Sequence, residues 1–210
     1  LSVELSNGCI FSNNFTLIDE TISGCDTSSG GTVSDLFISH ITDSPTGGLT
    51  YIELYNATGS DIDFSVTNYT VSIFFNGSGA TNINNIATLT SGIITNGGTY
   101  IISAGESSSQ CPVTGGDGSF ANSNADDIQN GINFGSSTSD CIRLTNPAAV
   151  DVGNPDGVVD VWGVFGDSTW SGSSGLGTSG ANFVRDTGAT LPNTNYSNSD
   201  WIITNYDNCS

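Results

Sequence analysis

The chain has 210 residues, of which 36% are hydrophobic, and 21 acidic residues stand against two basic ones, giving a formal net charge of −19. This length suits one well-buried β-sandwich and is too short for two full domains. The acidity disfavours nucleic acid and anionic membrane surfaces as partners, because both need Lys and Arg to displace counterions, and we expect neither nucleic-acid binding nor membrane insertion. It favours solubility, divalent cations or cationic surfaces.

Residues 1–31 form a distinct N-terminal extension. Strand-like pieces at residues 3–5, 10–11 and 15–18 precede a flexible Gly/Ser-rich link. We expect this extension to be ordered, either docked on its own domain or donated as a strand to a neighbouring copy. The remaining residues, 32–210, are expected to form a single β-sandwich.

Short strands joined by polar turns dominate the rest of the chain. Tyr51, Glu53 and Tyr55 alternate with Ile52 and Leu54, as in a half-buried antiparallel strand. No stretch shows a convincing helical period or an apolar run long enough to cross a membrane. The sequence therefore predicts an all-β fold, an antiparallel sandwich. The predicted strands cover residues 35–42, 50–56, 69–75, 86–89, 99–103, 141–145, 157–163, 182–185 and 200–204.

Five cysteines lie far apart in the sequence, and with no CxxC motif and a single histidine they lack zinc-site spacing. Disulfides, and hence an oxidising compartment, are the better interpretation. The natural pairs are Cys9–Cys25 and Cys111–Cys141, each closing a polar loop. Cys209 is then left over, to pair with another subunit or with an N-terminal cysteine in a different connectivity.

An ordered set of short motifs runs from about residue 33 to residue 205. It comprises DLFIS at 35–39, YIELYN at 51–56, TYII at 99–102, DCIRL at 140–144, DGVVDVWG at 156–163, FVR at 183–185 and DW at 200–201. This set resembles the lamin-tail domain family, in particular its secreted bacterial members. The resemblance implies an immunoglobulin-like β-sandwich and a surface-associated, non-catalytic module. The N-terminal extension lies outside the family pattern.

Candidate catalytic groups are few. His40 is the sole histidine and lies on a predicted strand, where a structural or surface role is expected, and Glu53 occupies the acidic position of the family motif. No nucleophile–base pair, phosphate loop or nucleotide fingerprint is evident. The sequence therefore predicts a protein that is not an enzyme, with no catalytic residue and no organic cofactor.

One cluster of oxygen-bearing side chains is a candidate calcium site. Asp151, Asn154, Asp156 and Asp160 lie within ten residues, with Gly157 allowing a sharp turn. Calcium prefers six to eight oxygen ligands of this kind. The spacing differs from that of an EF-hand, and a plain Asp-Gly turn explains the same residues, so both interpretations stay open.

The tryptophans and the N-glycosylation sequons are only weak signals of an exposed sugar-binding or glycosylated surface. Trp162, Trp170 and Trp201 could form a sugar-stacking platform, but their family-like positions favour core packing. Asn-x-Ser/Thr sequons permit N-glycosylation without arguing for it, since this composition produces about as many by chance. The six sequon asparagines are Asn14, Asn56, Asn68, Asn76, Asn195 and Asn208.

Two functions fit this pattern. The chain begins at Leu1, which we interpret as a mature form after signal removal, and the cysteines favour an extracellular, secreted or cell-surface protein. The first hypothesis is a self-assembling subunit of a surface filament that polymerises by exchange of an N-terminal strand. The second is an adhesin or carbohydrate-binding module of a larger surface protein. The expected partners are therefore copies of the chain itself or surface glycans.

Overall fold

The computed structural model divides the chain into two compact units, which are described separately. The first comprises Leu1–Thr32 and the second Val33–Ser210, one residue from the predicted boundary. In the first unit, β1 (Val3–Glu4) pairs antiparallel with β2 (Ile10–Phe11). The residues that the structure describes are 3–4, 10–11, 35–43, 49–77, 85–104, 124–129, 132, 139–146, 157–169 and 181–205.

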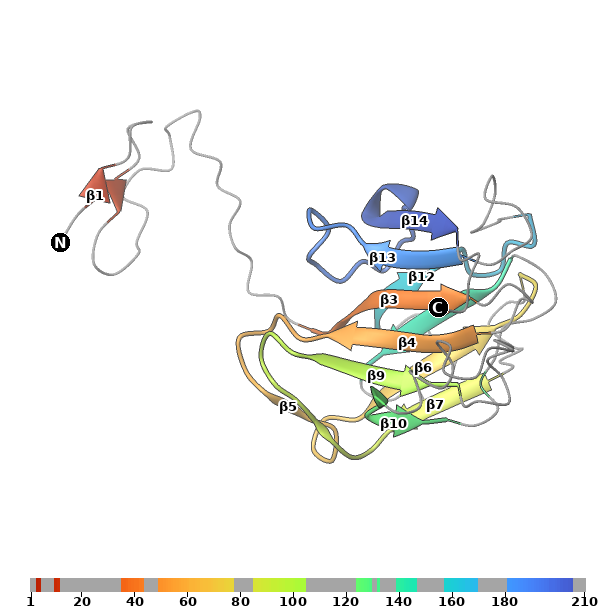
Figure 1. The fold of residues 1–210 in the computed structure, drawn as a ribbon, viewed down its shortest axis with the longest axis horizontal. Coiled ribbons are helices and arrows are strands. Elements are labelled where there is room, and N and C mark those ends of the chain that lie inside the picture. The colour runs from red at the N-terminus through yellow and green to blue at the C-terminus, as the bar shows by residue number, and fades with distance from the viewer. Residues whose placement is uncertain are drawn as a thin grey trace. The chain divides into compact units, whose positions relative to one another are not determined.

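The second unit contains a six-stranded sheet in the order β10-β9-β4-β3-β13-β14 (Figure 1). Its neighbours pair antiparallel except β9 and β10, which run parallel. The antiparallel sheets agree with the predicted sandwich, and the one parallel pair among them arises because β10 follows β9 through a long connection rather than a hairpin. The strands are β3 (Phe37–Asp43), β4 (Leu49–Tyr55), β9 (Thr99–Ser103), β10 (Asp127–Ile128), β13 (Ala181–Arg185) and β14 (Trp201–Asn205).

A four-stranded antiparallel sheet in the order β12-β11-β6-β7 forms the other layer. A separate two-stranded ladder joins β5 and β8, and one short 3-10 helix, η1, precedes β14. These elements are β6 (Tyr69–Phe74), β7 (Asn85–Leu89), β11 (Cys141–Thr145), β12 (Val158–Trp162), β5 (Ile62–Asp63), β8 (Ile93–Ile94) and η1 (Asn198–Asp200).

The apolar core lies between the two sheets. Ile52 and Leu54 of β4 face it from one sheet, and Val71 and Ile73 of β6 face it from the other, all fully buried. The residues of β4 from Tyr51 onward that alternate with these two are only half-buried, as the sequence predicts. The all-β, sandwich-like fold is thereby confirmed.

A second, smaller cluster covers the opposite face of the four-stranded sheet. Phe74, Cys141 and Val161 are buried there, with Phe165 and Tyr196 packed against them. Phe74 and Phe165 meet edge to face, with ring centroids 4.9 Å apart. All residues of β6 are buried because the strand has apolar material on both faces.

Among the described residues, no helix is long and apolar enough to span a membrane.

Candidate functional site

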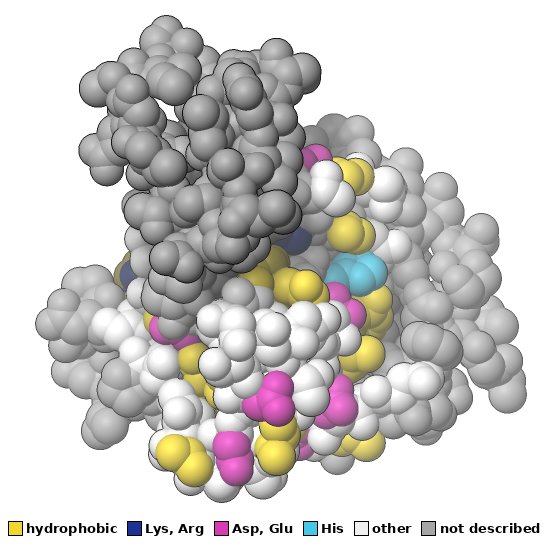
Figure 2. Space-filling model, turned by 90° about the vertical axis from the view of Figure 1, so that its left-hand side faces the viewer, with side chains coloured by type: hydrophobic (Ala, Val, Ile, Leu, Met, Phe, Trp, Pro, Cys, Tyr) yellow, Lys and Arg dark blue, Asp and Glu magenta, His cyan; other side chains and the backbone are white. Residues whose placement is uncertain are grey.

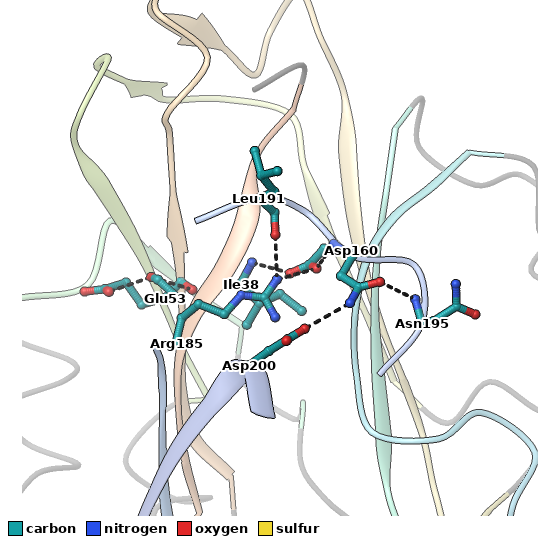
Figure 3. Close-up of polar contacts among 9 residues, drawn as sticks. Ile38, Glu53, Asp160, Arg185, Leu191, Asn195 and Asp200 are labelled. Atoms are coloured by element: carbon teal, nitrogen blue, oxygen red, sulfur yellow. Dashed lines mark hydrogen bonds and ion pairs between the residues drawn. The ribbon is translucent and has the colours of Figure 1, made fainter. Parts of the chain in front are cut away.

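The two sheets are joined by a buried ion pair between Asp160 of β12 and Arg185 of β13 (Figure 3). The Arg185 Nη2 atom lies 2.6 Å from Asp160 Oδ1, and the two side chains are 4% and 0% exposed. Arg185 also donates to the Leu191 carbonyl at 3.3 Å. Its guanidinium carbon lies 4.8 Å from the centroid of the Trp201 ring and 5.5 Å from that of Phe37. The guanidinium thus lies close to two aromatic rings as well as to the carboxylate.

The groups that contact the Asp160 carboxylate are hydrogen-bond donors. Besides Arg185, the backbone N–H of Asn193 donates to Oδ1 at 2.7 Å, and that of Ile38 donates to Oδ2 at 2.8 Å. Burial raises the pKa of Asp160 to about 6, although Arg185 and the backbone donors oppose the shift. Ile38 of β3 and the segment from Arg185 to Asn193, which are far apart in the sequence, therefore both bind one carboxylate of β12.

This environment corrects the predicted role of Asp160 as a calcium ligand. The carboxylate is fully buried and faces donors, so it is not open to a cation. The other three candidates, Asp151, Asn154 and Asp156, lie outside the described residues. Within the part of the chain that the structure describes, no group of three or more His, Cys, Asp or Glu side chains could hold a metal ion.

The second arginine is also held against aromatic rings. The guanidinium carbon of Arg143 lies 3.4 Å from the centroid of the Phe165 ring and 5.8 Å from that of Phe74. Burial lowers the pKa of Arg143 from its ordinary value. Both basic residues of the chain therefore pack against aromatic rings, and the acidic chain has no further Lys or Arg to form a basic patch.

The cysteine prediction is corrected at one position. Cys141 is a free, buried cysteine, so the predicted Cys111–Cys141 disulfide is not formed in the structure. The physical reason is its place at the start of β11, where the thiol points into the cluster of Phe74 and Val161. Burial raises the pKa of this thiol to about 12, and the S–H contacts the Gly163 carbonyl at 3.8 Å. The remaining cysteines, Cys9, Cys25, Cys111 and Cys209, lie outside the described residues.

The sequon asparagines differ in exposure. Asn56 is fully buried, and its amide nitrogen donates to the carbonyls of Ser60 and Ile94. In the folded chain Asn56 is therefore a turn-stabilising residue rather than a glycan acceptor, which corrects its candidacy. Asn68, Asn76 and Asn195 are exposed, while Asn14 and Asn208 lie outside the described residues.

The sole histidine belongs to a polar group on the six-stranded sheet. His40 Nδ1 lies 3.1 Å from the Tyr51 hydroxyl, and the rings meet edge to face at 5.1 Å. The Thr42 hydroxyl lies 3.5 Å from His40 Nε2 but donates its proton to Asn182 Oδ1 at 2.8 Å. Nearby, the Ser39 hydroxyl donates to Glu53 at 2.6 Å. These cross-strand contacts give His40 and Glu53 structural roles, as the sequence indicates.

Replacing His40 with glutamine is expected to remove part of the pH dependence of stability. Burial lowers the pKa of His40, opposed by the charge of Glu53 and a hydrogen bond with Asn182. In the unfolded chain the histidine has a pKa of about 6.5, so the unfolded chain takes up the proton first as the pH falls. The free energy of unfolding therefore drops below that pH and continues to drop through the lower folded pKa.

Urea unfolding of wild type and His40→Gln between about pH 8 and pH 5 measures this effect. Because the chain has one histidine, the difference between the two curves isolates its contribution. Wild type should lose more stability than the variant as the pH falls. Parallel curves for the two proteins would show that His40 titrates alike in both states.

Two of the three tryptophans are core residues. Trp162 and Trp201 are 3% and 6% exposed, which confirms the core interpretation for both, while Trp170 lies outside the described residues. Comparisons with protein-family models, curated proteins and solved structures found no match. The resemblance to the lamin-tail domain therefore stays a prediction.

Sequence reasoning missed the Asp160–Arg185 pair. It placed Asp160 in a cation site and Arg185 at the end of a family-like strand without joining them. One signal was present: the chain has only two basic residues, and a basic residue within an apolar strand needs an acidic partner when it is buried.

Proposed function

We propose that this chain is a non-catalytic extracellular structural protein that assembles into a surface filament by adding an N-terminal strand of one copy to the sandwich of the next. The observation that carries the proposal is the division of the chain after Thr32 into a small unit and a large sandwich. The small unit shows a hairpin of two residue pairs, Val3↔Phe11 and Glu4↔Ile10. An isolated two-stranded hairpin is marginally stable in water, so it gains from joining a larger sheet.

The contacts of the titratable groups support a non-catalytic role. Asp160 and Arg185 form the ion pair that joins the two sheets, and Glu53 accepts a hydrogen bond from Ser39. His40 has the hydroxyl of Thr42 nearby, but that proton is directed to Asn182. A nucleophilic hydroxyl needs its proton aimed at the base, and the proton of Thr42 is not aimed at His40.

The alternative, an adhesin or carbohydrate-binding module, draws less support from the described residues. That function would need exposed tryptophans on which a sugar can stack, and Trp162 and Trp201 are buried. Their rings pack on Phe183 and on Arg185 and are not offered to a ligand. The immunoglobulin-like, lamin-tail-like character of the sandwich is part of the filament proposal and would suit either role.

Electron microscopy of the full chain beside a chain that begins at Val33 tests the proposal. Filaments are expected from the full chain and not from the shortened one, because the donated strand is missing. The shortened chain should keep the far-UV circular dichroism and thermal transition of the sandwich, which shows that loss of filaments is not loss of fold. Single particles from both chains would contradict the proposal, and a glycan-binding screen would then test the alternative.

A further inference from the structure

Among the described strands, the two large sheets of the second unit end in four edge strands, β10, β14, β12 and β7, which differ in how well they are protected. Edge strands expose unpaired backbone groups, so proteins usually shorten, cover or charge them. β12 is covered, since the Val161 N–H donates to the Asn193 carbonyl at 3.0 Å. β10 has only two residues and carries Asp127. β7 and β14 are five residues long and have no charged side chain within the strand.

β14 also has apolar neighbours that β7 lacks. Ile202 of β14 is 48% exposed and pairs with Val184 of β13, which is 40% exposed. These two form an apolar pair on the outer face of the sheet at its margin. On β7, the equally exposed Ile86 pairs with the buried hydroxyl residue Ser72 instead. A strand added beside β14 would therefore cover more apolar surface than one added beside β7.

The hydrogen-bonding direction of β14 follows from its register. The Asp186 N–H donates to the Asp200 carbonyl at 2.8 Å, one position beyond the ladder pair of Arg185 and Trp201. Hydrogen-bonded and non-bonded residue pairs alternate in an antiparallel ladder. Since Asp200 is bonded to Asp186, the backbone N–H and C=O of Ile202 also bond β13, and those of Ile203 point away from it. By the same alternation the groups of Asn205 point outward.

The outward N–H of Trp201 is already used, because it donates to the Asn198 carbonyl at the end of η1. In the described part of the chain, the outward groups of Ile203 and Asn205 have no backbone partner. Figure 1 shows β14, in blue, at the margin of the sheet. The open positions thus alternate along the strand, as an incoming strand requires.

We infer that the edge of β14, Trp201–Asn205, is the acceptor for a strand from the N-terminal unit of a second copy. This inference rests on the proposed function and names the site at which the copies join. A strand of an acidic chain can approach this edge because no charged side chain lies within Trp201–Asn205, although Asp200 precedes it, whereas β10 carries Asp127 within its two residues. Backbone hydrogen bonds to Ile203 and Asn205, together with burial of the Ile202 and Ile203 side chains, would hold the added strand in place.

A proline at position 203 tests the inference in the full chain. Ile203→Pro removes an outward N–H, and proline is tolerated at such edge positions, so the ladder to β13 should survive. Ile203→Ala is the matched control, because it shortens the same partly buried side chain and keeps the N–H. We expect Ile203→Pro to raise the concentration needed for filaments by roughly tenfold or more, and Ile203→Ala to assemble close to wild type.

Amide hydrogen exchange of the wild-type chain provides a second readout that needs no variant. On assembly, the amides of Ile203 and Asn205 should gain protection, while that of Ile202, already bonded to β13, should change little. Protection on β7 instead, or normal filaments from Ile203→Pro, would overturn the inference and leave the filament function standing. Loss of assembly in both variants with an intact fold would also overturn backbone pairing at β14. Wild type that never assembles would overturn both proposals.

Discussion

Asp160→Leu is expected to lower the free energy of unfolding by about 3–5 kcal/mol. The substitution leaves the Arg185 charge buried without its partner, and it leaves the backbone N–H groups of Ile38 and Asn193 without an acceptor. Each orphaned buried donor adds a desolvation cost of about 1–3 kcal/mol. Urea unfolding monitored by tryptophan fluorescence measures the loss, because Trp162 and Trp201 are both core residues.

Two further variants make this result specific. Asp61→Leu replaces an exposed carboxylate and should cost less than about 1 kcal/mol. In the double variant Asp160→Leu/Arg185→Met the buried charge is gone, yet the two N–H groups remain unpartnered, so the stability should recover only in part. An Asp160→Leu variant as stable as wild type would show that the contacts of the Asp160 carboxylate do not hold the sheets together.

Phe183→Ala is expected to destabilise the sandwich by about 3–5 kcal/mol. Phe183 of β13 is 1% exposed, and its ring meets Trp162 of β12 edge to face with centroids 4.8 Å apart. Truncation removes buried apolar area and opens a cavity between the sheets. Val184→Ala, one residue along the same strand and 40% exposed, is the matched control and should cost less than about 1 kcal/mol. Equal losses from the two variants would contradict this placement of the core.

The regular strands were predictable because burial on one face imposes alternation. All nine segments predicted after residue 35 are strands, with ends within about two residues of those observed. β5, β8 and β10 were not predicted, because two residues are too few to show a period. The parallel pairing of β9 with β10 was equally invisible, since it depends on where a long connection returns to the sheet.

The candidate site was less predictable, because spacing along the chain does not show which way a side chain points. Asp160 lies close in sequence to Asp156 and Asp151, which suggested a shared cation. On β12 it faces inward instead, opposite Leu144, and reaches Arg185, a residue 25 positions away. The strand that begins at Cys141 was predicted, but its disulfide was not borne out, because the thiol lies on the outer face of β11, which is itself packed.

Sedimentation velocity of the full chain over a range of concentrations tests the central claim, self-assembly, most directly. The proposed heterologous strand addition does not close, so the average sedimentation coefficient should keep rising with concentration without reaching the plateau of a fixed oligomer. The measurement belongs at physiological salt, where the repulsion between chains of net charge −19 is screened. A single monomeric species at every concentration would contradict the account.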